Sequence, residues 1–111
     1  MALTRKKKTI DPLMKPNSLQ IMTLLKKHKT EILSDYNLSQ MGVFGSYSRG
    51  EETPESDVDI LIDVQRPMGL LRFVHLKNHL HALLGIKVDL VMKSALKPAL
   101  REIILRETRY L

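Results

Sequence analysis

The chain has 111 residues, the length of one domain with a thin core, and its 43% hydrophobic and 27% charged residues are typical of globular proteins. No apolar run reaches the ~20 residues that a membrane helix needs, and the absence of cysteine excludes disulfides, thiolate metal sites and a cysteine nucleophile, so we expect a cytoplasmic protein without membrane contact. The formal net charge of +6 favours an anionic partner, although a solvated basic surface without any partner would produce the same value.

Two segments differ in composition, and the boundary between them lies near Pro16. Residues 1–16 contain five Lys or Arg and two Pro, which predicts a flexible basic lead-in. The remaining residues, 17–111, show no repeat and no linker, so we expect them to form one domain. Asn17 and Gln20 have the spacing of a helix capping box, and the apolar periodicity that follows predicts a helix over residues 18–34.

Two strands with a polar loop between them are predicted next. Residues 41–44 are a short apolar run, and residues 45–55 are rich in Gly, Ser, Pro and Glu, which predicts a loop with room for one helical turn after Ser46. Residues 58–64 alternate as a strand does. One face of that strand carries Val58, Ile60, Ile62 and Val64, and the other carries Asp57, Asp59, Leu61 and Asp63.

The last third of the chain predicts a helix, a strand and a final helix. Leu70, Phe73, Leu76, Leu80, Leu83 and Leu84 recur at helical spacing before Gly85, and residues 86–92 form a strand. Pro98 suits the start of the last helix, whose inner face would be Leu100, Ile103 and Ile104, and residues 108–111 can leave it as a short strand. The predicted fold is α+β: a small mixed sheet flanked by helices, in the order helix, strand, loop, strand, helix, strand, helix.

Polar residues with a chemical use lie at the ends of the first two strands. Gly45 lets the backbone approach a ligand closely, and Ser46 adds a hydroxyl next to loop amides that can bind an anion. Asp57 and Asp59 are two residues apart on one strand, so their carboxylates leave the same face with backbones about 7 Å apart. Such a pair repels itself unless a cation is bound, and oxygen ligands of this kind suit Mg²⁺.

A third acidic residue, Asp89, interrupts the apolar strand over residues 86–92. Its neighbours Val88 and Leu90 are apolar, so Asp89 should point away from the core. If this strand lies beside the strand that carries Asp59, a third carboxylate joins the pair. It could then ligate a second magnesium ion or help to deprotonate an attacking hydroxyl.

These residues resemble the GS-x10-DxD signature of the DNA polymerase β-like nucleotidyltransferases. The run from Gly42 to Asp63 is similar to that of the minimal nucleotidyltransferases in its entirety. The segments over residues 87–91 and 97–111 are similar to that subfamily's third-carboxylate strand and closing segment. The resemblance covers most of residues 20–111 and does not include the basic lead-in.

The resemblance implies a nucleotidyltransferase fold and a specific role for each residue of the site. Asp57, Asp59 and Asp89 would be the catalytic residues and would ligate two magnesium ions. Gly45 and Ser46 would hold the triphosphate of ATP, and Arg49 would lie near its phosphates. Domains of this kind are often paired with a HEPN toxin, and some silence the toxin by transferring AMP to one of its tyrosines. The resemblance therefore implies an antitoxin that is a protein adenylyltransferase.

Two other functions are compatible with the same sequence. An inactive relative would bind nucleotide or a toxin without transferring AMP. A basic RNA-binding module would use the basic residues Arg5 to Lys8 and surface lysines, but no aromatic residues alternate with the lysines as they do in single-strand binders.

The thin core also makes a homodimer possible when no partner is present. His75 and His79 lie four residues apart, but no third zinc ligand is evident, so a polar helix face is the preferred interpretation.

Overall fold

The protein is described by a computed structural model that covers residues 16–111. The predicted flexible lead-in lies outside the described residues except for Pro16, which is buried. In chain order the elements are α1 (Ser18–Tyr36), β1 (Leu38–Phe44), the single-turn α2 (Ser46–Arg49), β2 (Val58–Val64), α3 (Leu70–Leu84), β3 (Val88–Met92), the 3-10 turn η2 (Lys93–Ala95), α4 (Pro98–Glu107) and β4 (Arg109–Tyr110).

The strands form one mixed sheet in the order β3-β2-β1-β4. β1 pairs antiparallel with β2, which follows it after the loop that contains α2, and with β4, which the chain reaches only after α4. β2 and β3 are parallel, since α3 carries the chain back across the sheet between them. The predicted α+β class, the element order and the short strand at the end of the chain are confirmed.

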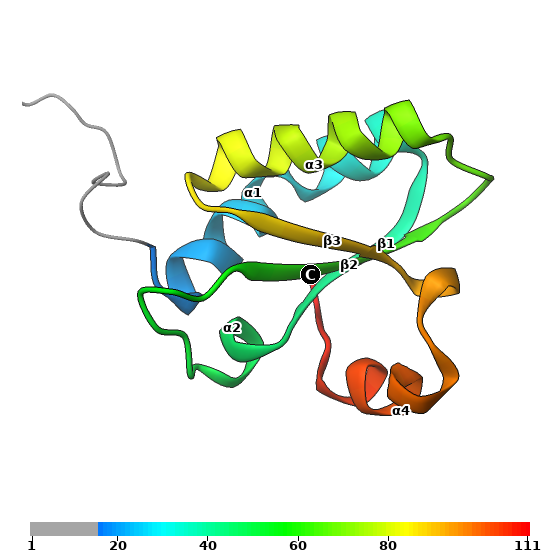
Figure 1. The fold of residues 1–111 in the computed structure, drawn as a ribbon. Coiled ribbons are helices and arrows are strands. Elements are labelled where there is room, and N and C mark those ends of the chain that lie inside the picture. The colour runs from blue at the N-terminus through cyan, green and yellow to red at the C-terminus, as the bar shows by residue number, and fades with distance from the viewer. Residues whose placement is uncertain (1–15) are drawn as a thin grey trace, which may run out of the picture.

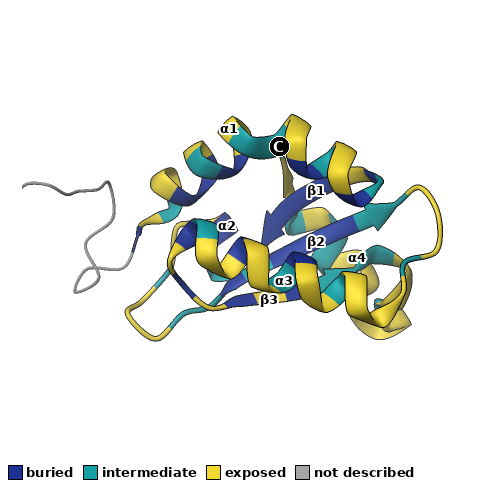
Figure 2. Ribbon diagram, turned by 90° about the horizontal axis from the view of Figure 1, so that it is seen from above, coloured by how far each residue is buried: buried dark blue, intermediate teal, exposed yellow. Residues whose placement is uncertain are grey.

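Helices α1 and α3 cover one face of the sheet, and their apolar sides form the core with it (Figures 1 and 2). The core includes the predicted inner faces of α1, α3 and β2, whose fully buried members are Ile21, Leu25, Ile32, Leu76, Leu80, Leu84, Val58, Ile60 and Ile62. The β1 residues opposite Ile60 and Ile62, Val43 and Met41, complete this layer. Because the apolar side chains of β2 point into this core, the Asp59 side chain must point to the opposite face of the sheet.

The end of α1 and the start of β1 differ from prediction by a few residues. α1 continues to Tyr36, and Asn37 ends it in the left-handed conformation with φ 56°, its N–H donating to the carbonyls of Leu33 and Ser34. One residue therefore makes the turn, and β1 begins at Leu38 rather than at Met41. The Asn17 capping box is present as predicted, with both reciprocal hydrogen bonds formed.

The opposite face of the sheet is covered by much less structure, namely α2 and α4 (Figure 1). Leu61 and Phe44 are buried on this side, outside the main core cluster. The predicted inner face of the last helix is wrong, because α4 buries none of its residues and Leu100 and Ile103 are 50% and 57% exposed. Ile104 and Leu105 are only partly buried, and Glu107 at the end of α4 accepts a hydrogen bond from Gly45.

Two further predictions are corrected at the ends of α3 and β3. Leu70 begins α3 as expected but is 76% exposed, at the rim of a cavity between α3 and β3. β3 begins at Val88 rather than Ile86, since Gly85 ends α3 with φ 68° and the chain needs two residues to reach the sheet. Among the described helices, none is both long enough and apolar enough to cross a bilayer.

Candidate functional site

The loop that follows β1 is shaped by Gly45. This residue has φ 74°, a conformation that L side chains rarely adopt, and a Cβ placed on it would lie 2.1 Å from Oδ2 of Asp59. Glycine is therefore required for two reasons, the backbone conformation and the close approach of a carboxylate. The predicted single helical turn follows as α2, which begins with the partly buried Ser46.

The back of this loop is tied to the start of α1. Tyr47 is buried, with its hydroxyl donating to the carbonyl of Pro16 at 3.1 Å. The Ser18 hydroxyl donates to the carbonyl of Tyr47 at 2.6 Å, and its backbone N–H donates to Glu52 Oε2 at 2.8 Å. These contacts hold α2 against the first turn of α1, so the position of Ser46 is fixed by the fold rather than by the loop alone.

The acidic residues of β2 and β3 meet across the parallel strand pair. Asp59 and Asp89 are direct partners in the register, and Phe44, at the end of β1, is the partner of Asp59 on its other side. Neighbouring strands are about 4.8 Å apart, so the two carboxylates share one small region of the open face. Asp57 precedes β2, where it is partly exposed and has Lys87 Nζ 4.0 Å from its Oδ2. Asp59 and Asp89 therefore lie together, and Asp57 is near enough for its charge to affect the pKa of Asp59.

Crowding of carboxylates changes the acidity of Asp59. Several causes together raise the pKa of Asp59 from 3.8 to about 6. Burial is the largest, followed by the charge of Asp89, a side-chain hydrogen bond with Asp89, and the charges of Asp57 and Glu107. Asp59 is partly buried, whereas Asp89 is exposed. The site is therefore short of positive charge at neutral pH, which a bound cation would supply.

Sequence reasoning missed one residue of this site, Glu107. Its Oε2 accepts the N–H of Gly45 at 2.8 Å, and its Oε1 accepts from Nη1 of Arg49 at 2.7 Å. Arg49 was expected near phosphates, and here its Nε also donates to Glu51 at 2.9 Å. No local pattern could reveal Glu107, because 62 residues separate it from Gly45 and it ends a helix that has no buried face.

The donor set suits a hard divalent cation. The grouped side chains offer carboxylate oxygens only, and their mutual repulsion, expressed in the raised pKa of Asp59, would be relieved by Mg²⁺. Among residues 16–111, no three acidic or histidine side chains already have the arrangement of a formed metal site. The carboxylates would have to rotate toward a metal, which the exposed Asp89 and partly exposed Asp57 have the space to do.

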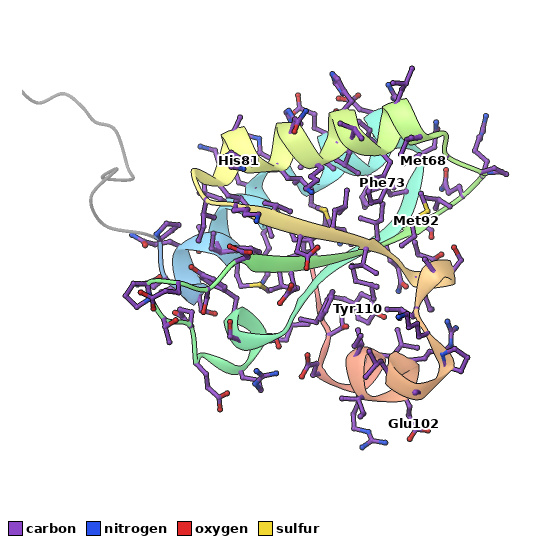
Figure 3. The ribbon with its side chains drawn as sticks, in the orientation of Figure 1. Met68, Phe73, His81, Met92, Glu102 and Tyr110 are labelled. Atoms are coloured by element: carbon purple, nitrogen blue, oxygen red, sulfur yellow. The ribbon has the colours of Figure 1, made fainter. Side chains whose placement is uncertain are left out.

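Other groups in the described part of the chain do not compete as the reactive site. His75 Nδ1 is 2.7 Å from the Tyr36 hydroxyl, in a contact that joins α3 to α1. A cavity of about 430 Å³ lies between the start of α3 and β3, and Met68, Phe73 and Met92 gather there (Figure 3). Its full lining is Met68, Leu70, Phe73, Leu90, Val91, Met92 and Ala95, none of which can bind a phosphate or donate a proton.

Comparison with known proteins agrees with this fold and site. The profile of the nucleotidyltransferase domain family matches residues 25–111. The chain therefore belongs to the nucleotidyltransferase domain family and is an enzyme of that class.

Individual relatives make the comparison more specific. The chain is 47% identical over 91 residues to the protein adenylyltransferase MntA of Thermococcus cleftensis, an alignment that covers 82% of this chain and 92% of that protein. It also resembles a solved structure of a proposed minimal nucleotidyltransferase, with TM-score 0.70, 35% identity and coverage of 82% and 95%. A complex of a tri-AMPylated HEPN toxin with an MNT antitoxin from Shewanella oneidensis shares the fold, with TM-score 0.61, 22% identity and coverage of 81% and 70%.

Proposed function

We propose that this protein is a magnesium-dependent protein adenylyltransferase that transfers AMP from ATP to a hydroxyl group, a tyrosine of a HEPN-type toxin, and so acts as an antitoxin. The observation that carries the proposal is the register pair Asp59–Asp89, which brings two carboxylates together on the open face of the sheet beside the Gly45 loop. The adenylyltransferase MntA, 47% identical to this chain, supports protein adenylylation as the reaction.

In the proposed reaction, the acceptor hydroxyl attacks the α-phosphorus of ATP. A bond forms between the acceptor oxygen and that phosphorus, the bond to the pyrophosphate oxygen breaks, and AMP remains on the acceptor. Asp57, Asp59 and Asp89 would hold the magnesium ions, which neutralise charge on the phosphates when bound. Asp89 is exposed on the edge strand β3, so it can also accept the hydroxyl proton from a large incoming substrate.

The loop after β1 would bind the triphosphate in this scheme. The N–H of Gly45 and the guanidinium of Arg49 already hold a carboxylate, Glu107, so both groups are oriented toward an anion. Ser46 adds a hydroxyl on the same turn. Positioning and charge neutralisation would supply most of the catalysis, as in phosphoryl transfer generally.

A macromolecular acceptor fits the openness of the site. Asp89 is exposed on an edge strand, and α4 buries none of its residues, so the described residues 16–111 form no closed chamber around the carboxylates. A HEPN-type toxin is proposed as the acceptor because an MNT antitoxin of this fold forms a complex with an AMPylated HEPN toxin.

Labelled ATP tests the proposal directly. The purified chain is incubated with a candidate HEPN toxin, magnesium and ATP that carries a label on either its α- or its γ-phosphate. We expect the toxin to become labelled from the α-phosphate only, on a tyrosine, and the chelator EDTA to prevent the transfer. Label from the γ-phosphate would indicate a kinase, and binding of ATP without any transfer would indicate an inactive relative.

A further inference from the structure

Glu107 reaches the site through the edge of the sheet. It is the last residue of α4, and the strand that follows it pairs Arg109 with Val43 and Tyr110 with Gly42. Continuing this antiparallel register places Glu107 opposite Gly45, where β1 becomes the loop. A Cβ on Gly42 would lie 2.6 Å from Thr108 Cγ2, so glycine at this position allows the C-terminal segment to approach closely.

The Glu107 carboxylate joins two groups that can each bind an anion. One oxygen accepts a backbone N–H from Gly45 at 2.8 Å, and the other accepts from the Arg49 guanidinium at 2.7 Å. The Glu107 side chain is only 23% exposed, so both charge-assisted hydrogen bonds are partly shielded from water. With Glu51 on its Nε, the Arg49 guanidinium is held between two carboxylates.

A backbone amide and a guanidinium are also the donors that proteins commonly use for phosphate oxygens. The Glu107 carboxylate resembles a phosphate in the features that matter here, since it is negative and presents two acceptor oxygens in a plane. It also adds negative charge near Asp59. A triphosphate that uses the Gly45 amide and Arg49 must therefore remove Glu107 from both.

We propose that Glu107 is an internal stand-in for a nucleotide phosphate. It keeps the Gly45–Arg49 loop formed when no nucleotide is bound, and it competes with the nucleotide for the Gly45 amide and the Arg49 guanidinium. This inference rests on the proposed function, because it takes the loop to be the triphosphate site. Glu107 is thus a positioning residue that sets the affinity for the nucleotide.

Substitution Glu107→Gln separates competition from simple support. Glutamine keeps the size of the side chain and can still accept from Gly45, but it lacks the charge that competes for Arg49. We expect the Kd for magnesium with AMP-PNP, measured by isothermal titration calorimetry, to fall about tenfold. In an Arg49→Gln background the same substitution should change Kd by less than about twofold, because the contested donor is already absent. A residue that only supports the loop would instead raise Kd when substituted.

A matched control lies on the same helix. Glu102 pairs with Arg106 at 2.9 Å and points away from the sheet (Figure 3), so Glu102→Gln should leave Kd within about twofold of the wild-type value. Equal or weaker binding by Glu107→Gln, with wild-type binding intact, overturns the role of Glu107 and leaves the proposed function standing. If neither the wild type nor Glu107→Gln binds millimolar AMP-PNP, in samples whose NMR spectra show a folded chain, the proposed function and this inference are both wrong.

Discussion

The two faces of the sheet are built in different ways. Under α1 and α3, the strands contribute Val43, Ile60 and Ile62, each fully buried, and the helices add a continuous apolar layer. On the other face, the same strands contribute Gly42, Phe44 and Asp59, and the helix that lies over this side buries none of its residues. The buried residues gather where α1 and α3 face the sheet, whereas α4 is exposed or partly buried (Figure 2). On the side of α4, Glu107 joins the helix to Gly45 and Arg49 through hydrogen bonds.

The difference separates stability from function along a single strand. In β2, alternate residues face opposite ways, so Ile60 belongs to the core while its neighbour Asp59 belongs to the site. Burying a carboxylate beside other carboxylates is costly, and the raised pKa of Asp59 measures that cost. Packing on the apolar face supplies the stability that offsets the mutual repulsion of the acidic side chains on the other face.

The largest effect should come from the open face, through Asp59→Asn. The substitution keeps the shape of the side chain but removes a charge from the acidic cluster, so we expect AMP transfer to fall by about a thousandfold or more with the fold intact. Single-turnover transfer from labelled ATP measures the effect. Asp63→Asn is the control on the same face of the strand, where Asp63 lies 3.9 Å from Lys93 Nζ, and should stay within about twofold of wild type. Comparable losses in both variants would mean that general charge, not the site, is responsible.

On the apolar face, Ile60→Ala should act on stability instead. Ile60 is fully buried in the core that β1 and β2 form with α1 and α3, so losing its outer carbons should lower the free energy of unfolding by about 3 kcal/mol. Urea denaturation measures the change. Leu100→Ala, on a residue of α4 that is 50% exposed, should cost no more than about 0.5 kcal/mol. A larger cost at Leu100 would show that α4 is covered by a second surface in solution.

Gly45→Ala probes the contact between the loop and the acidic cluster. The added Cβ collides with Asp59 Oδ2, and a carboxylate displaced by about 1 Å should reduce transfer by about a hundredfold. Gly50→Ala makes a well-matched control, since Gly50 has a similar φ of 71° but nothing within 4 Å of its Cβ. Both variants should lose about 1 kcal/mol of stability from backbone strain, measured by urea denaturation, whereas only Gly45→Ala should lose transfer. Equal transfer by the two variants would contradict the contact.

The smallest expected effect is a pH dependence of stability without divalent cations. The pKa of Asp59 is about 6 in the folded protein against an ordinary 3.8, so the folded state binds this proton more tightly than the unfolded chain does. Ionised Asp59 therefore carries a penalty that is absent below about pH 4 and complete above about pH 7. Over that range, wild type should lose roughly 2 kcal/mol relative to Asp59→Asn, allowing for partial solvent screening.

Urea denaturation of both proteins from acid to neutral pH measures this difference, and magnesium added at neutral pH should recover part of the loss in wild type alone. If the free energy of unfolding depended on pH in the same way for wild type and Asp59→Asn, the pKa of Asp59 would not be raised in the folded protein.

The sequence by itself determined the features that depend on neighbours along the chain. Alternation in β2 placed Asp57 and Asp59 on the face away from the core, and the Asn17 capping box and Pro98 marked two helix starts. The Gly45-Ser46 pair marked the loop, because a close backbone approach requires glycine. Each of these inferences needs only strand or helix geometry, which the chain fixes locally.

Only the tertiary structure decided which distant residues meet. The parallel register pairs Asp59 with Asp89, and the pairing of β4 with β1 delivers Glu107 to Gly45 across 62 residues of chain. Apolar spacing in the last helix predicted a buried face, yet Leu100 and Ile103 are exposed, because amphipathic spacing shows that a helix has an apolar side but not what lies against it. Strand register and helix docking are set by packing over the whole molecule, so no segment of the sequence contains them.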